Sequence, residues 1–346
     1  MRRLTELIIR PEATATWIRA MLQRAQPSQA ILVVGTPGVG KRTLARALAR
    51  AWLCLQRTAE GACEHCKSCR KWSTEETHPD LRVLRPSPDQ IKIESVREAR
   101  QWTQFAPAVA PFRFVLIEEA HRLNPAAANA LLKTLEEPPP RYHFLLTSPT
   151  SDLLMPTLLS RCQIVRLGLL TPVELAQILI QRGVEPTIAQ RQAELAEGAI
   201  GRALRWSESP TASEWQTLTQ LVDLFAELGT APTTRALRMA EQFRTLCRQL
   251  ESATDDQSAR TALAVGLEYL LAWYRESLAL ETNKIRFRSY QSALERLAQR
   301  VPAPQRIRSI ERIIEARHAL LGNANAQIIT EDLFIYLLGI GEPHRA

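Results

Sequence analysis

The sequence has no apolar run long enough to cross a membrane, which would take about 18 residues. Its N-terminal segment, MRRLTELIIRPEATATW, also lacks the apolar core and small-residue cleavage site of a secretory leader. Internal repeats and low-complexity tracts are absent from the 346 residues. We therefore expect a cytoplasmic protein with about two or three globular domains and no membrane partner.

Basic side chains are in modest excess. The chain carries 44 Lys and Arg against 36 Asp and Glu, a net charge of +8 with neutral histidines. Such an excess agrees with a role close to nucleic acid. A solvated basic surface explains it equally well, so charge alone leaves both interpretations open.

Four of the six cysteines lie close together, as Cys54-x8-Cys63-x2-Cys66-x2-Cys69. In a cytosolic chain such a cluster predicts metal ligands rather than disulfides. Four thiolates complete a tetrahedral structural zinc site with no open position for catalysis. The alternative, four free surface thiols, is disfavoured because exposed thiols are reactive. The neighbouring His65 and His78 are not predicted ligands.

The first half of the chain alternates short apolar runs with helical patterns. Strands are predicted at Ala30–Gly35, Leu81–Leu84, Phe114–Glu118, His143–Thr147 and Gln163–Leu167, and helices at Arg42–Leu53, Glu94–Gln104 and Asn124–Glu137. Buried strands joined by helices indicate an α/β fold with a parallel sheet covered on both faces.

After Leu167 the sequence shows helical patterns only. Three short helices are predicted at Thr171–Arg182, Thr187–Glu197 and Arg202–Glu208, followed by a linker at Ser207–Ser213. About five further helices are expected from Glu214 to near Leu338.

The segment GTPGVGK, Gly35 to Lys41, follows a predicted strand and opens a predicted helix. Its glycines let backbone N–H groups close around an anion at a helix N-terminus, and Lys41 would reach the terminal phosphates of ATP or ADP. An incidental glycine-rich turn is the less favoured alternative. The residues predicted to contact the nucleotide are Gly35, Thr36, Pro37, Gly38, Val39, Gly40, Lys41, Arg42 and Thr43.

Two positions depart from a hydrolytic site. A Ser or Thr that offers a hydroxyl to Mg²⁺ is usual after the lysine, but Arg42 brings a positive charge there, and Thr43 points about 100° away. In VLIEEAH, residues 115–121, Glu118 takes the place of the usual metal-binding Asp, and Glu119 that of the water-polarising base. Together these changes predict a compromised Mg²⁺ site and weak or absent hydrolysis.

These motifs resemble the clamp-loader branch of the AAA+ ATPases. The resemblance also rests on HPDL at 78–81, IKIESVREAR at 91–100, NALLKTLEEPP at 129–139 and SRC at 160–162, and it is dense over residues 1–167. It implies a RecA-like AAA+ domain at 1–168 with a zinc module at 54–69. A helical lid at 169–212 and a helical collar for oligomerisation at 213–346 would follow.

The resemblance also implies partners and roles. The family belongs to the DNA polymerase III holoenzyme and loads the sliding clamp onto primed DNA in a ring with gamma or tau motor subunits and a delta subunit. Thr147 matches the first sensor position, and Arg161 matches an arginine finger that acts on a neighbour's ATP. By itself, a lone arginine such as Arg161 is more often a salt-bridge partner.

A second sensor arginine is also displaced, because Gly201 stands at its position and Arg202 follows one residue later. A site that keeps its finger but loses its metal suggests a stator subunit with little turnover of its own. The alternatives are an active motor ATPase of the same complex and an unrelated AAA+ regulatory or DNA-repair nucleotidase.

Overall fold

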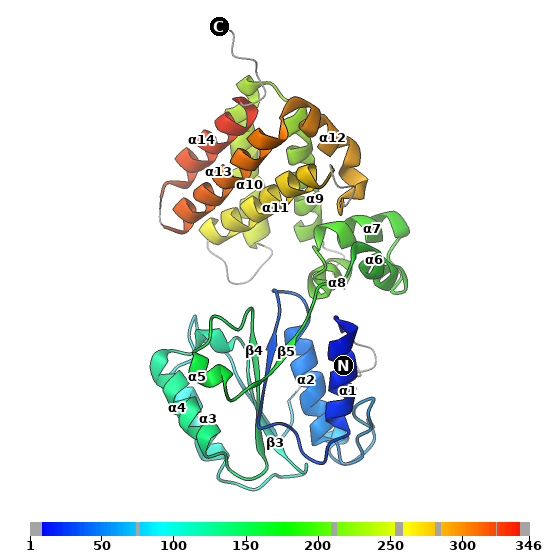
Figure 1. Ribbon diagram of the computed structural model, residues 1–346, viewed down its shortest axis with the longest axis vertical. Coiled ribbons are helices and arrows are strands. Elements are labelled where there is room, and N and C mark those ends of the chain that lie inside the picture. Colours follow the sequence, from blue (N-terminus) through cyan, green and yellow to red (C-terminus); the bar gives the residue numbers. More distant parts are fainter. Residues whose placement is uncertain are drawn as a thin grey trace. The chain divides into compact units, whose positions relative to one another are not determined.

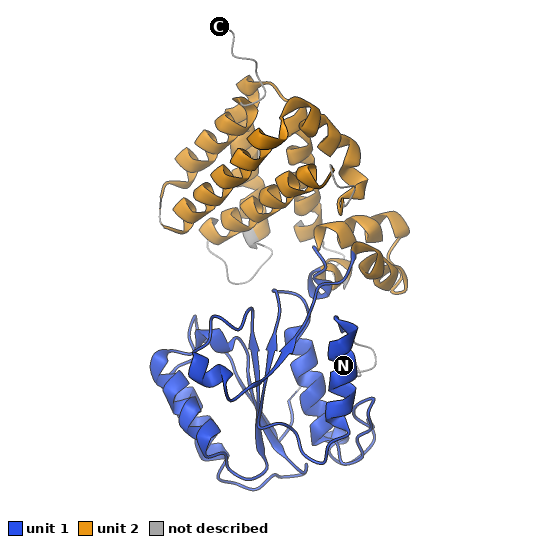
Figure 2. Ribbon diagram, in the orientation of Figure 1, with its two compact units in different colours: residues 1–171, 197–202 blue, residues 172–196, 203–346 orange. Residues whose placement is uncertain are grey.

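The computed structural model describes residues 9–73, 77–208, 213–252, 259–280, 285–322 and 324–339. The chain divides into two compact units, coloured separately in Figure 2. The first contains residues 1–171 and 197–202, and the second contains residues 172–196 and 203–346. The division into a domain, a lid and a collar at residues 168 and 212 stays a prediction.

A five-stranded parallel sheet forms the centre of the first unit (Figure 1). Its strands stand in the order β2-β3-β4-β1-β5. The five predicted strands are confirmed, as β1 (Ala30–Val34), β2 (Leu81–Leu84), β3 (Arg113–Ile117), β4 (Tyr142–Ser148) and β5 (Gln163–Arg166). This is the RecA-like topology that the resemblance implies.

Helices cover both faces of the sheet. On one face lie α1 (Glu12–Leu22) and α2 (Lys41–Leu53), and on the other lie α3 (Ile93–Trp102) and α4 (Pro125–Glu136). Successive strand residues point to opposite faces, so each strand contributes to two cores. In β1, Ile31 and Val33 join the core under α2, whereas Leu32 and Val34 join the core under α4.

The carboxyl ends of β1 and β4 form a switch point in the sheet. The connection after β1 leads to α2, which covers one face of the sheet. The connection after β4 leads to the short α5 (Pro156–Leu159), and its residues Leu154 and Leu158 belong to the core on the other face. In open parallel sheets, ligands bind outside strand ends whose connections diverge in this way. The glycine-rich loop lies at this point.

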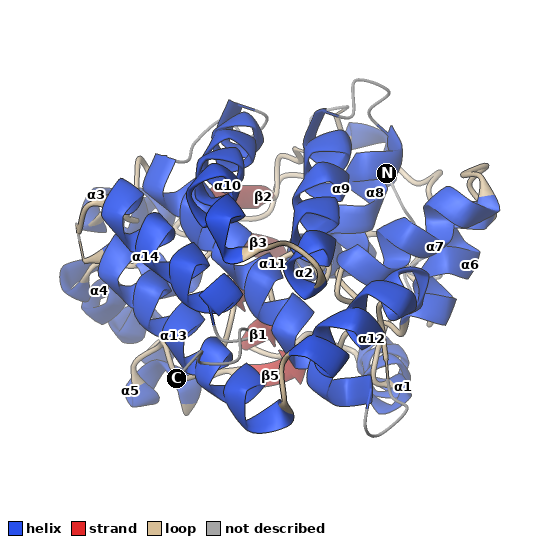
Figure 3. Ribbon diagram, turned by 90° about the horizontal axis from the view of Figure 1, so that it is seen from above, coloured by secondary structure: helices blue, strands red, loops and turns tan. Residues whose placement is uncertain are grey.

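Helices make up the described part of the second unit, and the strands of the described residues all lie in the first (Figure 3). Two short helices, α6 (Pro172–Ile180) and α7 (Pro186–Leu195), pack together. Within the larger bundle, α10 packs against α9, α11 and α14. The bundle helices are α9 (Ser213–Ala226), α10 (Ala236–Ser252), α11 (Ala259–Ala279), α12 (Gln291–Arg300), α13 (Ala303–Leu321) and α14 (Ala326–Gly339).

The described residues after Ser213 therefore contain six α-helices, where the sequence suggested about five. Much of the predicted linker at Ser207–Ser213 lies outside the described residues. The helix α8 (Ile200–Glu208) starts in the segment 197–202 that belongs to the first unit. Among the described helices, none combines the length and the apolar composition needed to span a membrane.

Candidate phosphate-binding and metal-binding sites

The glycine-rich loop has the backbone that its sequence predicts. Gly38 and Gly40 have φ angles of 78° and 100°, a region that glycine enters readily. Gly40 directly precedes Lys41, the first residue of α2. Consecutive N–H groups in such a turn at a helix N-terminus form a concavity that favours anions.

Lys41 folds over this loop. Its Nζ donates hydrogen bonds to the carbonyl oxygens of Gly35 and Thr36, at 2.6 and 2.9 Å. Burial lowers the pKa of Lys41, and the nearby Glu119 carboxylate opposes that shift. The ammonium group is thus held at the loop, where a phosphate would meet it.

Thr147 and Glu119 meet beside the loop through the backbone. The buried Thr147 hydroxyl accepts a hydrogen bond from the N–H of Glu119, with a length of 3.0 Å. Glu119 itself adopts a left-handed φ of 55°, and its carboxylate forms an ion pair with Arg122 at 2.8 Å. The Glu119 carboxylate, which the sequence suggested as a residual base, is therefore engaged by Arg122.

Glu118 is surrounded by arginines. Its buried carboxylate lies 3.0 Å from both Arg42 Nε and Arg46 Nη2 through Oε1, and 3.1 Å from Arg85 Nε through Oε2. Arg46 stands one helical turn after Arg42 on α2, and Arg85 directly follows β2. Sequence reasoning identified Arg42 and Glu118 but missed Arg46 and Arg85. The only available signal was the i, i+4 spacing of Arg42 and Arg46, which places both on one face of α2.

This donor set does not fit Mg²⁺. Magnesium binds hard oxygen ligands, usually carboxylates and water together with substrate phosphates. Here the hydroxyl position carries a guanidinium, and both oxygens of the acid are engaged by arginines. Two like charges 4 Å apart repel by about 4 kcal/mol at an effective dielectric constant near 20, so a cation beside Arg42 would be disfavoured.

The turn that carries Gly201 rests on the phosphate loop. The N–H of Gly201 donates to the carbonyl oxygen of Gly38 at 2.7 Å. A Cβ on Gly201 would come within 2.9 Å of that same oxygen, and a Cβ on Gly38 would meet Ala199 at 3.1 Å. The neighbouring Arg202 lies 3.8 Å from Glu197. Glycine at position 201 therefore allows backbone-to-backbone contact with the loop.

Arg161 lies on the surface just after α5. Its guanidinium is 2.8 Å from the carboxylate of Glu136, at the end of α4, and it also donates to the carbonyl oxygen of Thr157 at 3.0 Å. Both members of the ion pair are substantially exposed, at 36% for Arg161 and 50% for Glu136. The side chain is therefore held in position on a solvent-facing surface.

The four clustered cysteines converge. Their sulfur atoms all lie within 4.8 Å of one another, with 3.8 Å between Cys54 and Cys66 and 4.0 Å between Cys63 and Cys69. A tetrahedron with zinc–sulfur bonds of about 2.3 Å has edges of about 3.8 Å, so the arrangement is compatible with structural zinc. Burial would raise the pKa of Cys66, but hydrogen bonds from the N–H groups of Cys69 and Leu55, together with those from the Cys69 and Cys63 side chains, lower that pKa to about 6.

The two neighbouring histidines have other roles. His65 is exposed and contacts the Cys63 carbonyl and Gln56. The buried His78 accepts a hydrogen bond from the N–H of Asp80 at Nδ1, so its Nε2 carries the proton toward Ser68 Oγ, 3.1 Å away. Ser68 in turn donates to the carbonyl oxygen of Leu53 at 2.6 Å. This chain of hydrogen bonds ties the cysteine module to the end of α2.

Asp80 organises a loop thirty residues further along the chain. Its buried carboxylate accepts hydrogen bonds from the N–H groups of Ala108, Val109 and Ala110, at 2.6 to 2.9 Å, and from Arg113 Nε at 3.1 Å. Burial alone would raise the pKa of Asp80, but these hydrogen bonds hold it below its ordinary value. The HPDL motif thus supports the fold rather than a reaction.

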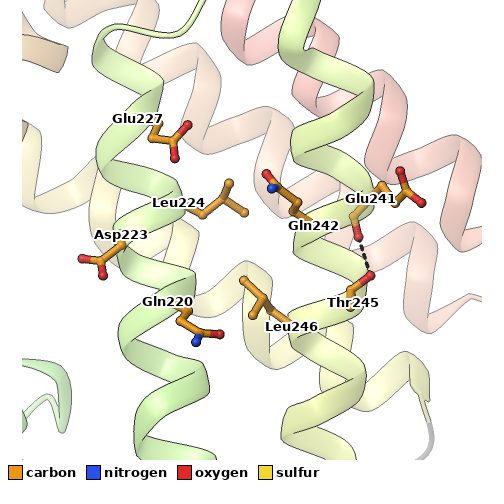
Figure 4. Close-up of a pocket in the computed structure, with 8 residues that line it drawn as sticks. All are labelled: Gln220, Asp223, Leu224, Glu227, Glu241, Gln242, Thr245 and Leu246. Atoms are coloured by element: carbon orange, nitrogen blue, oxygen red, sulfur yellow. Dashed lines mark hydrogen bonds between the residues drawn. The ribbon is translucent and has the colours of Figure 1, made fainter.

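A cavity of about 420 Å³ opens between α9 and α10 in the second unit (Figure 4). Leu224 and Leu246 lie between polar side chains on the two helices, and Glu227 forms an ion pair with Arg235 at 2.7 Å. The cavity contains none of the residues that the sequence predicted for a site. Its lining residues are Gln220, Asp223, Leu224, Glu227, Glu241, Gln242, Thr245 and Leu246.

Comparisons with known proteins agree with the motifs. Residues 10–171 match the family described as DNA polymerase III, delta subunit. The DNA polymerase III subunit tau of Escherichia coli is 34% identical over 241 residues, which cover 68% of this chain and 37% of that protein. Subunit delta' of Pseudomonas aeruginosa is 40% identical over 40% of this chain and 43% of its own length. Subunit delta' of Bacillus subtilis is 24% identical over 91% of this chain and 92% of its own length.

The matched regions therefore span under half the length of the tau protein and of the Pseudomonas delta' protein. Both delta' and tau proteins appear among the relatives, so similarity alone does not separate the two kinds of subunit.

Proposed function

We propose that the chain, whose residues 10–171 match the family described as DNA polymerase III, delta subunit, acts as a clamp-loader stator of the delta' kind. In this role it helps to load the sliding clamp onto primed DNA, and it acts on the ATP of a neighbouring motor subunit while hydrolysing little ATP itself. Its partners are gamma or tau motor subunits, the delta subunit, the clamp and primed DNA.

The ion pair between Arg42 and Glu118 is the observation that carries this proposal. In a hydrolytic site these two positions hold Mg²⁺ between them. Here they contact each other at 3.0 Å, and Arg46 and Arg85 engage the same carboxylate. A subunit built in this way keeps the phosphate loop without the metal that hydrolysis requires.

Arg161 is the residue through which a stator would act. An arginine finger stabilises the charge that develops on the γ-phosphate in the transition state, so it changes the rate more than the assembly. The exposure of Arg161 supports this role, and its exposed ion pair with Glu136 is of a kind that contributes about 0–1 kcal/mol to stability. Little free energy therefore opposes its transfer to a partner.

The cysteine module and the bundle have structural roles in the proposal. Zinc bound by Cys54, Cys63, Cys66 and Cys69 would hold the segment between α2 and β2 in one conformation. The helical bundle after residue 213, in which α10 packs against α9, α11 and α14, would join the collar of the ring.

The test is a reconstituted complex of this chain with motor subunits, delta and clamp. We compare the wild type with Arg161→Ala and Glu136→Ala, which remove the same ion pair from opposite sides, and with the surface control Arg97→Ala. We expect all four complexes to assemble, and only Arg161→Ala to lower clamp-stimulated ATPase activity and slow loading on primed DNA. Equal effects of the Arg161 and Glu136 substitutions would instead assign the pair a structural role.

A motor role is the second candidate, because the tau relative is 34% identical over two thirds of this chain and the loop retains its glycines and Lys41. A motor would hydrolyse ATP in a Mg²⁺-dependent way as the purified chain, and Lys41→Ala would abolish that activity. The stator proposal requires that the purified wild-type chain and the Lys41→Ala variant show the same negligible ATP turnover.

A further inference from the structure

Positive charge gathers around the buried carboxylate of Glu118. Arg85 follows β2, Glu118 follows β3, and Arg42 and Arg46 lie in the first half of α2, directly after the loop. Three guanidinium groups surround this one carboxylate. Lys41 adds a further cation on the loop itself.

Arg42 brings a fixed positive charge to the place where a hydrolytic nucleotide site binds a magnesium ion. The charges differ in kind, because a guanidinium is planar, always protonated and presents several N–H donors that match phosphate oxygens. Arg42 is also more than half exposed (56% for its side chain), so a ligand on the loop has access to it. The loop therefore meets a fixed cation at the place where a hydrolytic site recruits a soluble one.

We propose that the phosphate loop binds a polyphosphate group without a divalent cation, with Arg42 beside Glu118 in place of the metal. The inference deepens the stator proposal and rests on it. The ligand class is a pyrophosphate group, either free or as part of a nucleoside diphosphate or triphosphate. No bond is made or broken, so the ligand is held as a stable part of the subunit.

Glu118 is a positioning residue in this arrangement. It contacts Arg42 and Arg85 through different oxygens and so holds both guanidinium groups at one carboxylate. The N–H of Gly201 donates to the Gly38 carbonyl oxygen, so this contact holds the loop through a carbonyl group and not through the N–H groups that would receive an anion.

The experiment measures binding of ADP, inorganic pyrophosphate and adenosine to the purified chain by calorimetry, in EDTA and in Mg²⁺. We expect ADP and pyrophosphate to bind in EDTA and to bind no more tightly in Mg²⁺, because the ion competes for the same phosphate oxygens in solution; adenosine should not bind. Arg42→Thr should weaken binding in EDTA by about tenfold or more, since it removes charge-assisted hydrogen bonds. Arg97→Ala, which removes an exposed arginine on α3, is the matched control and should bind as the wild type does.

Several outcomes overturn the inference. Wild-type binding that strengthens by about tenfold or more in Mg²⁺ would show that the site recruits the metal after all. Binding by adenosine but not by pyrophosphate would place recognition outside the loop. No binding of any ligand in either buffer would also overturn the inference, but it would leave the stator proposal intact, because that proposal is decided by Arg161 in the reconstituted complex.

Discussion

Arg42 Nε and Glu118 Oε1 lie 3.0 Å apart, and this contact joins the two positions between which a nucleotide hydrolase holds its metal. The two partners differ in environment. Arg42 is more than half exposed, whereas Glu118 is buried together with Arg46. Substitutions of the two residues should therefore have very different effects on stability.

Glu118→Gln should destabilise the first unit strongly. Removing one partner of a buried ion pair costs about 3–5 kcal/mol, and here it deprives the buried Arg46 of this carboxylate. Arg42→Thr should cost about 1 kcal/mol or less, because the pair it breaks is half exposed. Urea denaturation of both variants checks the difference, and equal losses would show that the arginine cluster is not organised around Glu118.

Loss of one cysteine ligand should release zinc and lower the melting temperature. Cys63→Ser leaves three sulfur ligands, and a loss of about 3 kcal/mol would lower the transition by roughly 6–12 °C in a domain of this size. Native mass spectrometry and calorimetry on the same preparation provide the measurement. Cys162→Ala is the control, because Cys162 lies outside the cluster. A wild-type chain that contains no zinc would contradict the assignment.

Gly201→Ala should destabilise the turn on the phosphate loop by about 1–3 kcal/mol, the usual cost of overpacking. The added methyl group would stand 2.9 Å from the Gly38 carbonyl oxygen, so the turn or the loop must shift. Gly168→Ala is a control in the same unit, since its methyl group would meet nothing closer than 3.5 Å. Thermal unfolding of the two variants gives the comparison. If the two variants have the same melting temperature, the contact between Gly201 and Gly38 does not hold the loop.

His143 should make stability depend on pH below neutrality. Its ring is buried beside Phe112 and Phe114 and donates from Nδ1 to the Ser28 carbonyl at 3.1 Å. Burial lowers the pKa of His143 to about 4, against about 6.5 in an unfolded chain. Between these values only the unfolded state takes up the proton, so stability falls as pH decreases, by up to about 3 kcal/mol.

The measurement is the free energy of unfolding of the wild type and of His143→Leu between pH 7 and pH 4. The variant lacks the titrating ring and should show the smaller decrease over this interval. Parallel curves would mean that the ring is protonated as easily in the folded chain as in the unfolded one.

The strands and most helices of the first unit follow from the sequence, because buried parallel strands are short, apolar and bounded by turns. The helix α1 escaped prediction. Its segment EATATWIRAML contains β-branched residues, and its N-cap position is Pro11 without a side-chain cap. It is held instead by the packing of Ile18, Met21 and Leu22 against the sheet, which local propensity does not register.

The candidate site was predictable residue by residue but not as an arrangement. Arg42 and Glu118 each depart from a hydrolytic pattern, yet they are 76 positions apart, and only the parallel order of the strands brings them together. Asp80 illustrates the same limit, since its partners at 108–110 and Arg113 lie on a distant loop and on β3. Spacing along the chain predicts metal ligands in one short segment far better than contacts between strand ends.

The cluster of arginines around Glu118 also limits which substitutions the chain can accept during evolution. Restoring a hydroxyl at position 42 leaves Glu118 engaged by Arg46 and Arg85, so a metal gains little from that single step. Changing Glu118 first removes the carboxylate that contacts the buried Arg46, which lowers the stability of the fold. Selection would act against this loss of stability before any gain in ATP turnover appeared. A lineage with this cluster would need coordinated substitutions at several positions to recover hydrolysis, and each intermediate would be less stable than its parent.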